Sequence, residues 1–170
     1  MNAELAVLRI VHILGGIIWV GTSLFMGSFL MPALATVGPT GGAVIGALKN
    51  RRLFTIIPVI ALLTMLAGLR LMMIVAAGHW SAFFATRGGA TYLFGAVCAL
   101  AGFLIFMSIS HPSLMRAIAI GPQLAQLPEA ERGPLAAELG RLRARGGRAG
   151  AITALLLVAT AIAMSLGRYM

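Results

Sequence analysis

Residues 9–21 read RIVHILGGIIWVG and place a histidine, His12, near the start of a long apolar run. From Ile10 to Met31 the chain has 22 residues without a formal charge. A helix of that length spans about 33 Å, which is enough to cross the roughly 30 Å hydrocarbon core of a membrane. An ionisable side chain inside such a span costs on the order of 2–3 kcal/mol, so it normally faces a cavity, a bound group or another helix.

The small residues that follow His12 set it beside an open helical surface. Gly15 and Gly16 lie one turn further along on the same side of the helix, and Trp19 follows one turn later. A bare surface next to an imidazole suits a large flat ligand, and haem is the candidate that this spacing indicates. The alternative is that the glycines allow close helix packing and that His12 bonds a neighbouring helix. The sequence leaves both interpretations open.

The composition of the chain places it in a membrane. Of its 170 residues, 60% are hydrophobic and 10% are charged, whereas a soluble domain has about 25% charged residues. The net charge of +9 comes from basic residues that flank the apolar runs. Membrane topology and anionic lipid headgroups explain this charge, so we expect the lipid bilayer as a partner and no nucleic acid. The single cysteine, Cys98, lies in an apolar run and is expected to serve packing.

Four apolar segments predict an all-α, four-helix integral membrane bundle that forms one domain over residues 1–170. Each segment is long enough to cross the bilayer as a helix. The expected spans are residues 5–31, 53–77, 89–110 and 149–167. Residues 33–35 imitate a signal-peptide cleavage motif, but the first apolar run is too long for a signal peptide, and we expect it to be retained.

Basic residues in the connections predict the orientation of the bundle. Lys49, Arg51 and Arg52 lie between the first two spans, and six arginines lie between the third and the fourth. By the positive-inside rule both connections face the cytoplasm and both termini face outward, in a multi-pass protein of the cytoplasmic membrane. The connection 112–148 has leucines at helical spacing and is expected either to form a basic amphipathic helix on the membrane surface or to be a solvated loop. The glycine-rich residues 38–46 are expected to form a loop.

This topology brings three basic residues to the outer third of the bundle. Arg9 and His12 lie on the first span, and Arg70 lies at a similar depth on the second, which runs in the opposite direction. Because Glu4 is closer to the surface, no acidic residue is expected to neutralise them, and a bound anion would balance the charge. The resulting hypothesis has His12 as the iron ligand of a haem and Arg9 and Arg70 as partners of its propionates. The alternative for Arg9 is that it snorkels to the lipid headgroups.

The other two histidines are weaker candidates for metal ligation. His79, beside Trp80 at the outer end of the second span, is either a second axial ligand or part of an interfacial aromatic belt. His111, at the cytoplasmic end of the third span, is too far from His12 to share one iron. It is either a ligand of a second haem or of a quinone headgroup, or an ordinary helix-end residue. No CxxCH motif signals c-type haem, and no CxxC tract signals a dedicated copper site.

Two stretches resemble a known family. VHILGGIIWVGTSLF, residues 11–25, resembles the first-helix pattern His-x-x-Gly/small-x-x-Trp of the HemJ-like protoporphyrinogen oxidases and their CopD-like membrane relatives. LKNRRLFTIIPVIALLTMLAGLRL, residues 48–71, resembles the start of their second helix. The resemblance implies a haem b site at His12 and a membrane redox role, often in a homo-oligomer. The HemJ-type enzymes also use a lysine near the start of the third helix, whereas the single lysine here is Lys49.

The leading functional hypothesis is therefore a b-type membrane cytochrome that transfers electrons to or from a quinone or another redox partner, with an oxidoreductase activity as an extension. The second hypothesis is a copper-handling or transport protein of the CopD-like group. The third is a non-catalytic membrane subunit that packs against a larger partner.

Overall fold

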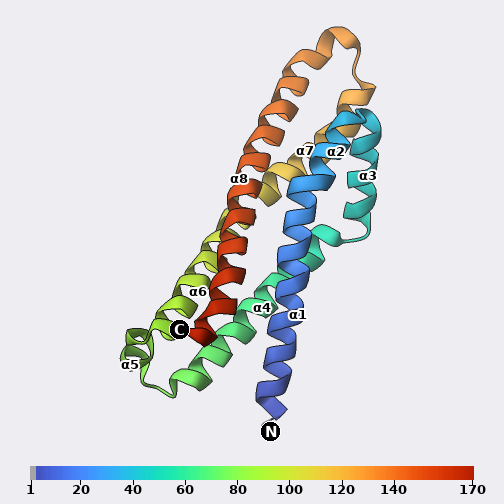
Figure 1. Cartoon of the computed structure of the whole chain (residues 1–170). Coiled ribbons are helices and arrows are strands. Elements are labelled where there is room, and N and C mark those ends of the chain that lie inside the picture. The colour runs from blue at the N-terminus through green and yellow to red at the C-terminus, as the bar shows by residue number, and fades with distance from the viewer. Residues whose placement is uncertain (1–2) are drawn as a thin grey trace.

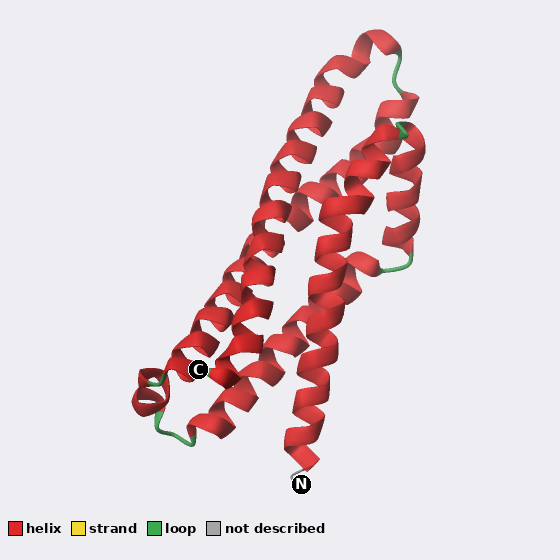
Figure 2. Cartoon of the chain, viewed as in Figure 1, coloured by secondary structure: helices red, strands yellow, loops and turns green. Residues whose placement is uncertain are grey.

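The computed structural model describes residues 3–170, the side chain of Pro39 excepted, and these residues form helices joined by short turns with no strand (Figure 2). Four helical stretches are long and apolar enough to cross a membrane: Ala3–Thr36, Leu53–Ala76, Arg87–Gln126 and Glu129–Tyr169. This confirms the expected all-helical chain with four spans, and the protein is a multi-pass membrane protein. Both termini and the short α5 (Trp80–Ala85) lie at one end of the molecule, opposite the turn that joins the last two spans (Figure 1).

The spans pair into two antiparallel hairpins. α1 (Ala3–Phe25) packs along α4 (Leu53–Ala76), and α6 (Arg87–Ile105) packs along α8 (Arg132–Leu166). The two hairpins meet at a small core that takes one buried side chain from each of the four helices. These side chains are Trp19, Ala61, Ala99 and Leu157.

The outer faces of the spans remain apolar and exposed. Ile17 on α1 is 64% exposed, Val75 on α4 is 61% exposed and Leu155 on α8 is 72% exposed. A soluble protein rarely shows apolar side chains along whole helices in this way. Lipid chains are the natural cover for this surface, so the packing agrees with the assignment of the spans to a membrane.

Two of the spans contain a π-helical turn directly before a proline. η1 (Met26–Leu30) lies before Pro32, and η2 (Phe106–Ser110) lies before Pro112. A proline has no N–H to donate within a helix, and its ring clashes with the carbonyl group four residues earlier. In both turns the residue just before the proline bonds instead to the carbonyl five residues earlier. The wider turn lets each helix pass its proline and continue.

The connection between the first two spans is more helical than expected. Residues 38–46 were expected to form a loop, and that prediction is wrong, because α3 (Pro39–Asn50) covers all but the first of them. Gly38 has a φ of +64°, a conformation that glycine adopts freely, and it separates α3 from α2 (Met31–Thr36). A proline at the first helical position and the apolar residues that follow then favour a helix in spite of the glycines.

Residues 112–148 are also helical, except for Leu127 and Pro128. α7 (His111–Gln126) continues the third span, and the short η3 (Glu129–Glu131) leads into α8. Because α8 is one helix of 35 residues, its first half extends the fourth span and packs on α7 (Figure 1). The segment is therefore part of a long helical hairpin and not a separate helix.

Candidate functional site

His12 is held by the helix against which its own helix packs. Its Nδ1 lies 2.8 Å from the backbone carbonyl oxygen of Thr64 on α4. A carbonyl oxygen only accepts, so Nδ1 carries the proton in this bond and donates it. In the neutral ring Nε2 then has no proton and keeps an available lone pair. Within residues 3–170 His12 makes no other hydrogen bond.

Gly68 makes room for this imidazole. It lies one turn after Thr64 on α4, and a Cβ atom at Gly68 would lie 2.6 Å from Cε1 and 2.8 Å from Nδ1 of His12. Any side chain there would push the ring away from the Thr64 carbonyl. Gly68 is thus a positioning residue for His12, which the sequence analysis did not identify. Gly68 lies four residues after Thr64, but this spacing predicts a role for Gly68 only when the contact between α1 and α4 is known.

The residues that were expected to offer a bare surface are covered by other helices. Gly15 is buried, and a Cβ atom there would clash with Thr64 Oγ1; at Gly16 the nearest atom is Cγ2 of the same threonine, at 3.9 Å. Trp19 is 4% exposed, and its ring meets that of Phe103 edge-on at a centroid distance of 6.2 Å. α4 and the bundle core therefore occupy this surface, as the alternative of close helix packing describes.

An open recess of about 510 Å³ lies beside His12. Its volume falls in the range of pockets that hold small ligands, about 300–1,000 Å³. All four spans contribute to its lining, the fourth through its last turn, η4 (Gly167–Tyr169). The lining residues are Arg9, His12, Ile13, Leu71, Tyr92 and Arg168. The recess therefore lies at the end of the bundle that carries both termini.

The lining of the recess is cationic. Within the described part of the chain, Arg9 and Arg168 have neither an ion-pair nor a hydrogen-bond partner, and the hydroxyl of Tyr92 has no hydrogen-bond partner. Gly167 leaves room for the Tyr92 ring, because a Cβ atom at Gly167 would lie 2.7 Å from Cε1 of the ring. Two guanidinium groups without a carboxylate suit an anionic group, which arginine binds in a bidentate manner.

Arg70 does not line this recess. Its Nη2 lies 2.7 Å from Oε1 of Glu4, and its Nε lies 2.8 Å from the same oxygen, so the pair joins α4 to α1. The expectation that no acidic residue neutralises the cations at this end of the bundle is therefore wrong for Arg70. The second guanidinium beside the recess belongs to Arg168, near the C-terminus, which the sequence analysis did not select.

The other two histidines lie away from the recess. His79 is exposed at the start of α5, after a turn in which Gly78 has a φ of +83°. His111 begins α7, and its ring packs on Phe106 at a centroid distance of 5.9 Å. Within residues 3–170 no group of three or more His, Cys, Asp or Glu side chains is placed to hold a metal ion.

Comparison of the chain with protein-family models, with curated proteins and with solved structures finds no match. The resemblance to the HemJ-like and CopD-like membrane proteins therefore stays a prediction from two short stretches of sequence.

Proposed function

We propose that this membrane protein binds a b-type haem in the recess beside His12 and transfers electrons. The observation that carries the proposal is the hydrogen bond between Nδ1 of His12 and the backbone carbonyl oxygen of Thr64. Because Nδ1 donates its proton to this oxygen, the lone pair of Nε2 is available to a metal ion. Metal-ligating histidines commonly donate their second N–H to a backbone carbonyl, which fixes the ring and strengthens the ligand.

The other residues that line the recess suit the porphyrin and the propionates of the haem. Ile13, Leu71 and the ring of Tyr92 offer apolar contacts to a porphyrin, and Arg9 and Arg168 offer cations to its two propionates. Haem brings its own ring nitrogens as ligands, so it needs fewer protein ligands than a copper ion does. This favours haem over the copper alternative in a chain where the described residues offer no multi-residue ligand cluster.

The residues of the recess have distinct roles in this proposal. Bound haem b supplies a one-electron iron couple. His12 anchors the iron, and Gly68 and the Thr64 carbonyl keep its ring in place. The positive charges of Arg9 and Arg168 favour the reduced, less positive iron and so raise its potential. No second histidine lines the recess, so His12 is the single protein ligand that we assign.

The positive-inside rule supports an outward-facing recess. The connections at the opposite end of the bundle contain three basic residues between the first two spans and six between the last two. The short connection at the same end as the recess contains Arg87. On this basis both termini and the recess face the outer side of the cytoplasmic membrane, where a redox partner can approach.

Absorption spectra of four proteins test the proposal: the unchanged chain and the single variants His12→Ala, His79→Ala and His111→Ala. Each is purified after expression with added haemin, and spectra are recorded before and after reduction with dithionite. We expect Soret and α bands in the unchanged protein and in the His79 and His111 variants, and their loss in His12→Ala. A colourless unchanged protein, or a His12→Ala protein with full bands, would contradict the proposal.

A further inference from the structure

A second recess lies toward the other end of the spans, between the third and the fourth. It is an open groove of about 490 Å³. Arg145 and Arg148, three residues apart on α8, lie on one side of that helix and line the groove together. Ile105, Ile109 and Ile152 supply its apolar part. The groove thus combines two guanidinium groups with three branched apolar side chains.

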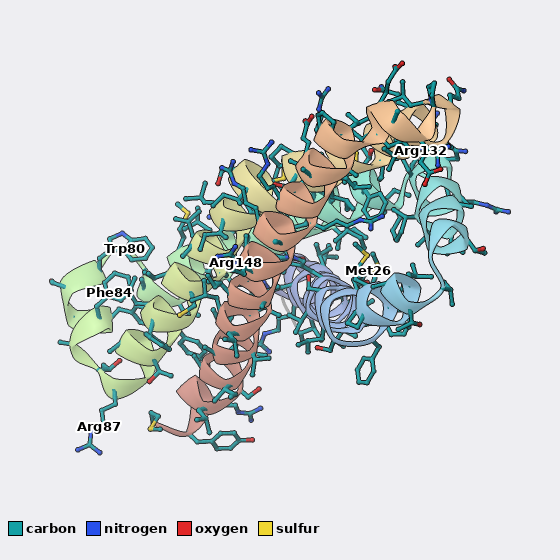
Figure 3. The ribbon with its side chains drawn as sticks, turned by 90° about the horizontal axis from the view of Figure 1, so that it is seen from above. Met26, Trp80, Phe84, Arg87, Arg132 and Arg148 are labelled. Carbon is teal, nitrogen blue, oxygen red and sulfur yellow. The ribbon has the colours of Figure 1, made fainter. Side chains whose placement is uncertain are left out.

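The position of this groove along the span matches a membrane boundary. From Ala149 to Leu166 α8 has 18 residues without a charge, which is about 27 Å of helix and close to the thickness of the hydrocarbon core. Arg148 therefore lies at headgroup level, whereas Ile152 lies one turn inside the hydrocarbon region. Figure 3 shows Arg148 part-way along α8, well separated from Arg132 at the start of the helix.

The two arginines of the groove have no partner in the protein. Within residues 3–170 neither Arg145 nor Arg148 makes a hydrogen bond or an ion pair. Two other arginines of the same hairpin do, whereas Arg141 and Arg143 do not within the described part of the chain: Arg116 lies 3.1 Å from a carboxylate oxygen of Glu138, and Arg132 donates to a backbone carbonyl at 2.8 Å. Two neighbouring positive charges at headgroup level therefore remain to be neutralised from outside the chain.

We propose that this groove binds one anionic glycerophospholipid of the adjoining leaflet. Its phosphate lies between Arg145 and Arg148, and an acyl chain lies along Ile105, Ile109 and Ile152. Basic pockets between membrane helices have the charge that such headgroups need. A zwitterionic lipid offers the same phosphate but cancels its charge within the headgroup, so the groove discriminates between the two. This inference does not depend on the binding of haem.

Native mass spectrometry of the full chain tests the proposal, with protein released from nanodiscs that contain phosphatidylglycerol and phosphatidylcholine in equal parts. We expect the unchanged protein to retain one phosphatidylglycerol in preference to phosphatidylcholine. The double variant Arg145→Gln/Arg148→Gln should lower the ratio of the two retained lipids on the order of tenfold. The matched control Arg141→Gln/Arg143→Gln removes the same charge from exposed residues of the same helix outside the groove and should leave the ratio nearly unchanged.

Two further variants separate a built site from diffuse attraction. Each single substitution, Arg145→Gln or Arg148→Gln, should lower the retained ratio several-fold. Ile109→Ala should also weaken retention, because it removes part of the contact with the acyl chain. An equal loss in the groove and control double variants, no preference in the unchanged protein, or no effect of Ile109→Ala would each overturn the proposal.

Discussion

The two helix hairpins use the same packing arrangement with different chemical results. In the α6–α8 hairpin the Thr160 hydroxyl lies 3.1 Å from the carbonyl oxygen of Gly95, and Thr153 makes a matching bond at 3.3 Å. In the α1–α4 hairpin His12 donates to the carbonyl of Thr64 at 2.8 Å. A threonine hydroxyl has one proton, and Thr160 shares it between the Gly95 carbonyl and the carbonyl oxygen of Leu156 in its own helix, 2.9 Å away. An imidazole that donates through Nδ1 still has Nε2, so the same arrangement leaves a basic nitrogen on a residue that lines the recess.

This difference indicates which feature of the sequence distinguishes the hairpin of the proposed haem site from the other hairpin. Glycines at helix contacts occur in both hairpins, at Gly15 and Gly68 in one and at Gly95 and Gly102 in the other. Close approach of two helices is therefore not specific to a cofactor site. The distinguishing feature is the type of side chain that donates across the contact.

The largest expected effect comes from Gly68→Ala, compared with Gly102→Ala in the other hairpin. The new methyl group at 68 would lie 2.6 Å from the His12 ring, whereas at 102 the nearest atom is 3.6 Å away, an ordinary contact. Overpacking costs about 1–3 kcal/mol. We expect Gly68→Ala to lose most of the haem absorbance per protein and to lower the unfolding midpoint in a detergent titration.

Gly102→Ala is the control for this comparison. Alanine is favoured over glycine inside a helix by about 0.8–1.0 kcal/mol, and nothing at 102 opposes the methyl group. We expect unchanged absorbance and an unchanged or higher unfolding midpoint. If the two glycine variants behaved alike, the positioning role assigned to Gly68 would be wrong.

The next effect is on the redox potential. Arg9→Gln and Arg168→Gln each remove a positive charge from the recess. Each should lower the midpoint potential by about 40 mV, which corresponds to a free energy of roughly 1 kcal/mol for a one-electron couple. Arg70→Gln is the matched control, because Arg70 is paired with Glu4 and lies outside the lining. Potentiometric titration followed in the α band measures all three. A larger shift for Arg70→Gln than for the other two would contradict the placement of the propionates.

A smaller effect is expected in the α6–α8 hairpin, on stability alone. Thr160→Val removes the hydroxyl that bonds Gly95 and keeps the shape of the side chain. Hydrogen bonds between membrane helices contribute about 0.6 kcal/mol on average. We expect a slightly lower unfolding midpoint and the full haem spectrum. Loss of the spectrum in this variant would mean that the two hairpins are not chemically distinct.

The smallest effect is expected from Glu4→Gln. The ion pair of Glu4 with Arg70 joins α1 to α4, but the two side chains are 45% and 50% exposed. Exposed pairs contribute about 0.2–1 kcal/mol and are screened by salt. We expect a stability loss of a few tenths of a kcal/mol in low salt and less in high salt. A loss independent of salt would show that the pair has another role.

The fold and part of the recess could be predicted from the sequence. Charge-free runs of sufficient length define the spans, and the cost of an ionisable group in lipid singles out His12. The prediction of a loop at residues 38–46 was wrong, because Pro39 at the first helical position and the apolar residues among the glycines favour a helix. Contacts between helices determine the remaining lining of the recess, which a local sequence pattern cannot predict.

The rest of the recess depends on contacts between residues far apart in the chain. Arg70 forms an ion pair with Glu4, 66 positions away, so it is not one of the unpaired cations that were expected at this end of the bundle. Tyr92 and Arg168 reach the recess only because the first turns of α6 and the short η4 lie beside the start of α1. The tautomer of His12 follows from a backbone carbonyl 52 positions away. No spacing within one helix encodes these three relationships.

Pulsed electron paramagnetic resonance shows directly whether Nε2 of His12 binds haem iron, as we propose. The protein carries His79→Ala and His111→Ala, so that His12 is its single histidine, and is labelled with histidine enriched in ¹⁵N at Nε2. We predict a ¹⁵N hyperfine coupling to the ferric iron that is absent when His12 is also replaced by alanine. Bound haem without that coupling, or no bound haem at all, would contradict the account.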